Sequence, residues 1–342
     1  MTEILIFFFF IIFSSIIYFI SVKKKLILDN TSFSKHKTFS SNLKTIPLLG
    51  GFFLLISLIL FLNLNLNFVI IFFLIFCLGL FSDINFLFKP TTRFYLQALI
   101  LFSFFFFSDI QILSTRIGFL DKLLEYSVFN YFFCCFCLMI LINGYNFIDG
   151  LNGLSLGYFI LVVINLFLIN EFILPNSIFI NNIYFIFSIF LIFVIILLSK
   201  IFLGDSGSYL IGVVTGLQII SVNFYNPQIS PYFLILLIWY PCFEVLFSMI
   251  RKKINKTSPL IPDTKHLHQL IYIYFKENFL LKYSNSISSI IILLYNLFII
   301  FFIENLIYNS LICILILCLN VMVYLMVYFL LSRSLYDFKK TK

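Results

Sequence analysis

Residues 183–225 read IYFIFSIFLIFVIILLSKIFLGDSGSYLIGVVTGLQIISVNFY, which is two long apolar runs on either side of a short polar turn. Each run approaches the roughly 20 residues that a helix needs to cross a bilayer. Neither run alternates apolar and polar residues as a barrel strand does, and a backbone in hydrocarbon must satisfy its hydrogen bonds within its own segment. The stretch therefore predicts two membrane-spanning helices joined by the turn at 204–208.

The same character extends over the whole chain. Of its 342 residues, 62% are hydrophobic and only 11% are charged, whereas soluble domains carry about 25% charged residues. This composition excludes a soluble globular protein and predicts an all-α, polytopic bundle of transmembrane helices. The apolar runs predict eleven spans, near residues 3–22, 47–64, 67–82, 94–113, 123–143, 154–170, 183–200, 209–225, 232–250, 288–304 and 309–331.

Basic residues are confined to alternate loops. All but Arg116 and Lys122 of the 22 Lys and Arg residues lie in the segments 23–46, 83–93, 200, 251–287 and 332–342. Short loops rich in Lys and Arg stay on the cytoplasmic side of a membrane. An odd number of spans then places the N-terminus outside and the C-terminus in the cytoplasm, in the plasma (inner) membrane. The net charge of +8 either attracts anionic lipids and phosphorylated substrates or only sets this topology.

A polar segment at 143–153 reads NGYNFIDGLNG. Asn143, Asn146, Asp149 and Asn152 recur at three-residue intervals, so they share one face of a tight helical turn. Carboxylates and amides at a membrane end are functional candidates, here for a diphosphate or sugar. The alternative is a set of helix-capping residues.

Two further motifs follow along the chain. In FLGDSGS, 202–208, Asp205 stands between glycines, which presents its carboxylate on a tight turn to a hard cation such as Mg²⁺, or makes it the N-cap of the next helix. In SPLIPDTKHLHQL, 258–270, His266 and His268 can donate to a phosphate or transfer protons near neutral pH. A pair of surface histidines without a role is the alternative.

A fourth segment, 79–97, reads GLFSDINFLFKPTTRFYLQ. A carboxylate, Asp83, is followed by the cations Lys89 and Arg93, and such a set can hold a phosphorylated ligand between charge partners. Lys89 and Arg93 alternatively only anchor the loop at the lipid headgroups. We expect one domain, 1–342, with catalytic loops near 35–51, 79–97, 143–153, 200–208 and 251–287.

Together these loops predict phosphoryl chemistry. Aspartates, amides, histidines and cations on one side of a membrane suit metal-assisted phosphoryl transfer, in which positioning and charge neutralisation supply most of the rate. An ion pump or carrier would instead hold its ionisable residues within the spans. Glu244, beside Pro241, is the one candidate acid inside an apolar run.

The ordered motifs resemble those of the polyprenyl-phosphate N-acetylhexosamine-1-phosphate transferases, which are relatives of the phospho-MurNAc-pentapeptide transferase. NFIDGLNG at 146–153 resembles the family's N-x-x-D-G-x-(D/N)-G, GDSGS at 204–208 its G-D-x-G-S, and HLH at 266–268 its histidine motif. The resemblance covers about residues 35–275 in ordered pieces.

This resemblance implies transfer of a sugar 1-phosphate from a UDP-sugar to polyprenyl (undecaprenyl) phosphate, with release of UMP, at the start of surface-polysaccharide or O-antigen assembly. It implies Mg²⁺, or alternatively Mn²⁺, held by Asp205 and Asp83. Catalytic roles are implied for Asp83, Asp149, Asp205, His266 and His268. Substrate contacts are implied for Lys44, Lys89, Arg93, Asn146, Asn152 and Phe202, the last by stacking on uracil.

One departure from the family pattern concerns the acid pair. Many members carry Asp-Asp where this chain has Ser82-Asp83, and the first acid is often proposed as a base. A lipid phosphate is already largely anionic near neutral pH, since its second pKa is about 6, so a strong base is not obligatory.

Two alternatives to this enzyme stay open. One is a non-catalytic polyprenyl-phosphate binding protein or flippase, and the other is an enzyme like the peptidoglycan transferase. Membrane lipids are expected partners and nucleic acid is not. A homodimer is an alternative to a monomer.

Overall fold

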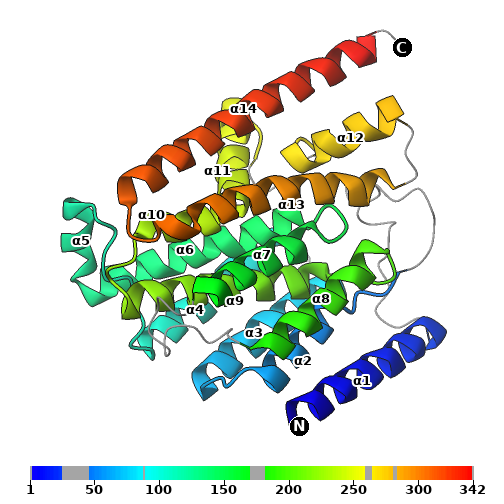
Figure 1. Ribbon diagram of the computed structural model, residues 1–342, viewed down its shortest axis with the longest axis horizontal. Coiled ribbons are helices and arrows are strands. Elements are labelled where there is room, and N and C mark those ends of the chain that lie inside the picture. Colours follow the sequence, from blue (N-terminus) through cyan, green and yellow to red (C-terminus); the bar gives the residue numbers. More distant parts are fainter. Residues whose placement is uncertain are drawn as a thin grey trace.

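The computed structural model describes residues 2–24, 46–87, 89–169, 182–258, 264–279 and 283–340, and in these ranges it is helical and without strands (Figure 1). Leu48 and Phe202 form an isolated β-bridge. The all-α prediction is confirmed. The α-helices are α1 (Thr2–Lys24), α2 (Gly50–Phe61), α3 (Leu66–Asp83), α4 (Pro90–Phe106), α5 (Gly118–Leu124), α6 (Ser127–Ile148), α7 (Leu154–Leu168), α8 (Ile183–Leu197), α9 (Gly204–Tyr225), α10 (Pro231–Leu237), α11 (Trp239–Ile254), α12 (Leu267–Phe279), α13 (Ser284–Ile303) and α14 (Ser310–Lys340).

The eleven predicted spans are not supported. In the described ranges, six helices are long and apolar enough to cross a membrane, namely α1, α3, α6, α9, α13 and α14, and the bent pair α10 and α11 makes up to seven. Helices α2, α7 and α8 have only 12 to 15 residues. At 1.5 Å per residue such helices are roughly 18–23 Å long, shorter than the hydrocarbon core of about 30 Å. The chain is thus a helical membrane protein, and the orientation of its termini stays a prediction.

The predicted span at 232–250 is broken. Helices α10 and α11 meet at Ile238 with a bend of 80°. Pro241 lacks an N–H, and its ring clashes with the carbonyl four residues earlier, which belongs to Leu237, the last residue of α10. Helix α11 therefore turns away from α10 and crosses the direction of α13 and α14 (Figure 1).

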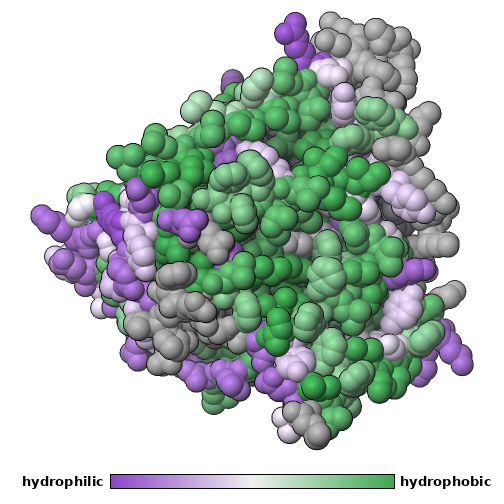
Figure 2. Space-filling model, viewed as in Figure 1, coloured by the Kyte–Doolittle hydropathy of each residue, from purple (hydrophilic) through white to green (hydrophobic). Residues whose placement is uncertain are grey.

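Helix α9 is the centre of the bundle. It packs mainly against α2, α3 and α6, and 89% of its most apolar stretch is buried. By contrast, only 17% of the corresponding stretch is buried in α1 and α14. Apolar side chains cover much of the visible face of the molecule (Figure 2), as expected where lipid is the solvent.

The first turn of α9 lies directly against the backbones of α2 and α3. A Cβ atom added to Gly79 would lie 2.6 Å from the backbone nitrogen of Ser206, and one added to Gly51 would lie 2.6 Å from the Ser206 Oγ. The backbone N–H of Gly51 also donates to the carbonyl of Leu203 at 3.1 Å. The three helices therefore meet through backbone contacts, which fixes the position of Asp205.

We predict that Gly79→Ala destabilises the protein by about 1–3 kcal/mol, because the added methyl group overpacks a backbone contact. Gly118→Ala is the matched control, since nothing lies within 4 Å of a Cβ at Gly118. The measurement is thermal unfolding in detergent, followed by the fluorescence of Trp239, the single tryptophan of the chain. Equal melting temperatures for the two variants would contradict the close contact.

Candidate active site

Asp205 lies at the start of α9, and its side chain is 12% exposed. Its Oδ2 accepts a hydrogen bond from the Ser82 hydroxyl at 2.5 Å and an ion-paired one from Arg93 Nη1 at 2.9 Å. Arg93 Nη1 also donates to the Ser82 Oγ and, at 3.4 Å, to the Tyr209 hydroxyl. The ends of α3, α4 and α9 thus bring a carboxylate, a guanidinium and two hydroxyl groups together.

Asp83, the last residue of α3, caps α9 from outside the helix. Its Oδ1 accepts the backbone N–H of Asp205 at 2.7 Å, and its Oδ2 accepts that of Ser206 at 3.0 Å. A helix N-terminus has unpaired N–H groups and a partial positive charge, and the carboxylate satisfies both. The capping role considered for Asp205 therefore belongs to Asp83. Gly204 has φ +76°, and a Cβ there would lie 2.7 Å from Asp83 Oδ2, so only glycine fits.

The 143–153 segment joins this cluster to the histidine motif. The Ser208 hydroxyl donates to Asn146 Oδ1 at 3.2 Å, which connects α9 to α6. The next residue, Phe147, lies edge-on to His266, with ring centres 5.1 Å apart. A Cβ on Gly150 would lie 3.0 Å from His268 Nε2. The predicted motifs of α6, α9 and α12 therefore form one connected region.

The predicted polar face of 143–153 is only partly formed. Helix α6 ends at Ile148, with half-buried Asp149 as its C-cap, so the three-residue repeat does not continue to Asn152. Asn152 instead donates from its side chain to Ser199 Oγ and from its backbone to Asn285 Oδ1, both at 2.6 Å. These contacts connect the turn to the residues just after α8 and to the start of α13.

Three other residues were predicted to contact substrate, and the structure describes two of them. Lys89 is exposed, immediately before α4. Phe202 is half-buried, and its backbone pairs with the segment before α2, donating to Pro47 and accepting from Gly50. Lys44 lies outside the described residues. Substrate contacts for these residues stay predictions.

His266 is paired with a buried carboxylate. Its Nδ1 lies 2.9 Å from Glu244 Oε1, and the Tyr324 hydroxyl donates to Glu244 Oε2 at 2.9 Å. Glu244 is fully buried in α11, where a carboxylate is tolerated only with such partners. The sequence marked Glu244 as an acid in an apolar run but not its pairing. Tyr324 lies in the apolar run of α14, where no local signal distinguishes it.

His268 is fully buried beside His266, with ring centres 5.5 Å apart and the planes 20° apart. Within the described part of the chain, neither of its ring nitrogens has a hydrogen-bond partner. Burial lowers the pKa of His268 to about 3, against the opposing effect of Glu244. His268 is therefore a neutral imidazole near pH 7.

A divalent cation at this site would be bound mainly by the carboxylate of Asp205. Among the described residues, no group of three or more His, Cys, Asp and Glu side chains could hold a metal ion. Both Asp83 oxygens already accept N–H groups of α9. Because Mg²⁺ is commonly bound by one or two carboxylates together with substrate phosphates, the residues fit an ion that binds with a diphosphate, not an all-protein cage.

Comparison with known proteins places this region in context. Residues 65–223 match glycosyl transferase family 4. The chain is 28% identical over 130 residues to the undecaprenyl-phosphate alpha-N-acetylglucosaminyl 1-phosphate transferase of Thermotoga maritima, covering 38% of this chain and 39% of that protein. It is 28% identical over 149 residues to the decaprenyl-phosphate N-acetylglucosaminephosphotransferase of Mycolicibacterium smegmatis, covering 37% of each. The protein of the same name in Mycobacterium tuberculosis is 26% identical over 149 residues, with 37% of each chain covered.

These matches span less than two fifths of this chain and about the same share of each relative. The family segment contains Asp83, Arg93, Asn146 and Asp205, whereas Glu244 and both histidines lie beyond it.

We predict that acidification destabilises the protein through His268. The unfolded imidazole has a pKa near 6.5 and the folded one about 3, so between these values the unfolded state binds the additional proton. Stability from this group is complete above pH 6.5 and falls by up to roughly 1.4 kcal/mol per pH unit below it. Melting temperatures at pH 7.5 and 5.5 should differ less in His268→Gln than in the wild type. Parallel pH dependence in the two proteins would contradict a neutral, buried His268.

Proposed function

We propose, from the match of residues 65–223 to glycosyl transferase family 4, that this protein transfers a sugar 1-phosphate from a UDP-sugar to a polyprenyl phosphate and releases UMP. The observation that carries the proposal is the cluster of Asp205, Arg93 and Ser82 on the Asp83-capped end of α9, inside the matched segment. The relatives are named for N-acetylglucosamine and for undecaprenyl or decaprenyl phosphate, which makes these the first choices of donor sugar and acceptor.

In the proposed reaction, an oxygen of the lipid phosphate attacks the phosphorus that bears the sugar, and the P–O bond to UMP breaks. The protein has to position the two anionic substrates and offset their charge. Arg93, with its side chain 22% exposed, would bind a diphosphate oxygen through its remaining donors. Asp205 would hold Mg²⁺, or Mn²⁺ as the alternative, and that ion supplies further charge neutralisation when bound.

Ser82 changes the charge of this cluster but leaves the reaction feasible. With serine in place of an acid, Asp205 is paired directly with Arg93 and hydrogen-bonded by the Ser82 hydroxyl. The attacking lipid phosphate is largely anionic near neutral pH and needs no proton acceptor from residue 82. Asp83 serves in this proposal to fix Asp205 at the start of α9.

The histidine motif would complete the phosphate site. His266, held by Glu244, is proposed to contact the diphosphate, and Asn146 and Asp149 would orient the donor from the end of α6. The basic segments predicted to be cytoplasmic support a site that faces the cytoplasm of a plasma (inner) membrane. Such a reaction would start the assembly of a surface polysaccharide or O-antigen.

The direct test uses purified protein, radiolabelled UDP-N-acetylglucosamine, Mg²⁺ and undecaprenyl phosphate. The expected result is label in the solvent-extracted lipid, equimolar release of UMP and loss of both on chelation. If the protein binds undecaprenyl phosphate but labels no lipid with any of a panel of UDP-sugars, it is a non-catalytic lipid-carrier binding protein or flippase.

We predict that Asp205→Asn lowers the transfer rate at least roughly 100-fold, because the carboxylate that would hold the charge-neutralising divalent cation is lost. Its melting temperature should stay near that of the wild type, since asparagine can still accept the bond from Ser82. Asp83→Asn, in contrast, should lower the melting temperature as well as the transfer rate, because an amide cannot accept both N–H groups of α9. An Asp205→Asn variant that retains full activity would remove the metal assignment.

We predict a smaller effect, about tenfold, for Ser82→Ala, because it removes one hydrogen bond to a charged group and no base. The comparison is the steady-state rate against that of Asp205→Asn under the same conditions. A loss as large as that of Asp205→Asn would show that Ser82 takes part in the chemistry.

A further inference from the structure

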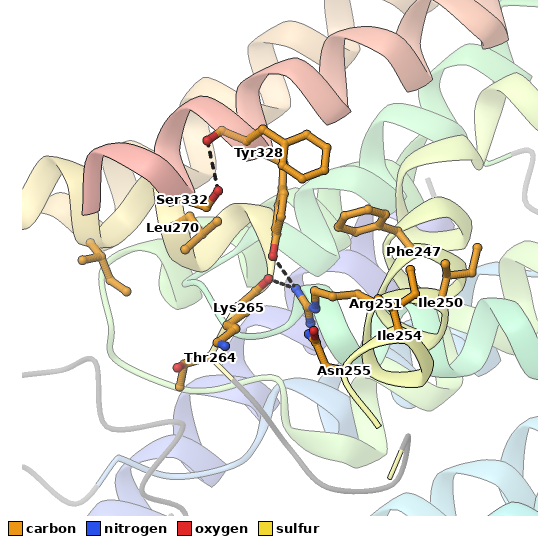
Figure 3. Close-up of a pocket in the computed structure, with 12 residues that line it drawn as sticks. Phe247, Ile250, Arg251, Ile254, Asn255, Thr264, Lys265, Leu270, Tyr328 and Ser332 are labelled. Carbon is orange, nitrogen blue, oxygen red and sulfur yellow. Dashed lines mark hydrogen bonds between the residues drawn. The ribbon is translucent and has the colours of Figure 1, made fainter. Parts of the chain in front are cut away.

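A cavity of about 620 Å³ lies between α11, α12 and α14 (Figure 3). None of the predicted site residues lines it. Helix α11 supplies one stripe of its lining, Phe247, Ile250, Arg251 and Ile254, at the spacing of a single helix face, and its C-cap Asn255 extends this stripe. The opposite wall comes from α14. The cavity is therefore a second concave region, distinct from the cluster around Asp205.

The cavity is apolar on one side and open to the membrane. Ile250 is 58% exposed, Ile254 is 75% exposed and Phe329 is 61% exposed. In a helical membrane protein, such exposed side chains are solvated by lipid tails. A hydrocarbon chain lying along them would continue from the bilayer into the cavity.

The other side of the cavity is cationic and rigid. Arg251 Nη1 donates to the Tyr328 hydroxyl at 3.1 Å and to the backbone carbonyl of Lys265 (Figure 3). Its Nη2 donates to Ser248 Oγ at 3.2 Å. Its guanidinium also lies over the Phe247 ring, 5.9 Å from the ring centre. Arg251 is thus held in place, and an arginine fork matches the oxygens of a phosphate.

Charge around the cavity favours an anionic ligand. Two cationic residues line the cavity, the buried Arg251 and the exposed Lys265, whose backbone carbonyl accepts from Arg251. Basic clusters next to membrane helices attract anionic lipid headgroups. A zwitterionic headgroup would place a second positive charge beside these cations.

We propose that this cavity binds an anionic phospholipid of the bilayer. Its headgroup phosphate would lie between Arg251 and Lys265, and an acyl chain would lie along Ile250, Ile254 and Phe329. The ligand would join α11 to α14, the two helices that also meet through Glu244 and Tyr324. This proposal does not depend on the transferase activity.

The test is native mass spectrometry of the delipidated full-length protein, titrated with phosphatidylglycerol, phosphatidylcholine of the same acyl chains, and undecaprenyl phosphate. Phosphatidylglycerol should bind one molecule per chain, at least tenfold more tightly than phosphatidylcholine. Lys265→Glu, which reverses a charge in the lining, and Ser332→Phe, which narrows the cavity, should each weaken phosphatidylglycerol binding about tenfold. Lys253→Glu is the matched control on α11, because Lys253 is exposed and outside the lining, and should change binding less than twofold.

Three results would overturn the proposal. They are equal affinities for the two phospholipids, unchanged binding in Ser332→Phe, and displacement of phosphatidylglycerol by equimolar undecaprenyl phosphate, which would make the cavity a substrate site. The lipid preference of the wild type decides the question even if a variant does not fold. Lipid selectivity without sugar transfer would retain this proposal and reject the proposed function, and transfer without selectivity would do the reverse.

Discussion

The carboxylate of Asp83 accepts the backbone N–H groups of Asp205 and Ser206 at the start of α9, and this contact holds Asp205 in the candidate site. Helix α9 is buried along most of its length, so the N–H groups at its start cannot rely on water. An acid supplied by α3 satisfies them, and the bare backbones at Gly51 and Gly79 let α2 and α3 come close enough. The contacts that hold this turn in place therefore also hold the candidate site residue Asp205, which belongs to the turn.

From this turn the contacts continue through residues far apart in the sequence. The Ser208 hydroxyl donates to Asn146, and the ring of Phe147 packs edge-on to that of His266. His266 is paired with Glu244, which also accepts a hydrogen bond from Tyr324. Helices α9, α6, α12, α11 and α14 are thus linked in that order. The buried carboxylate of Glu244 contacts both His266 and the Tyr324 hydroxyl of α14. Helix α14 therefore contacts the histidine motif through Glu244, although its own sequence carries no recognisable motif.

The sequence was sufficient to identify candidate site residues whose polar side chains are unusual beside hydrocarbon. It was not sufficient where the role of a residue depends on a contact with a distant part of the chain. Asp83, Arg93, Asn146, Asp205 and the histidines could be singled out because charged and amide groups are costly beside hydrocarbon, and the structure brings them into one region. Asn152 was grouped with them by periodicity, but α6 ends four residues earlier and turns it toward α13. The span count failed because apolar runs continue through turns and short helices, and the role of Asp83 as a cap depends on a partner more than 100 residues away.

The burial of α9 also bears on how fast different parts of such a chain diverge. A side chain that faces lipid needs only to be apolar, so leucine, isoleucine and phenylalanine can replace one another there at little cost, as the 50 phenylalanines of this chain suggest. A side chain or glycine packed between helices has no such freedom. The segment that matches glycosyl transferase family 4 begins next to α3 and ends within α9, while the lipid-exposed α1 and α14 lie outside it. The segment that matches the family thus includes nearly all of the most buried span of the bundle, whereas the two least buried spans lie outside it.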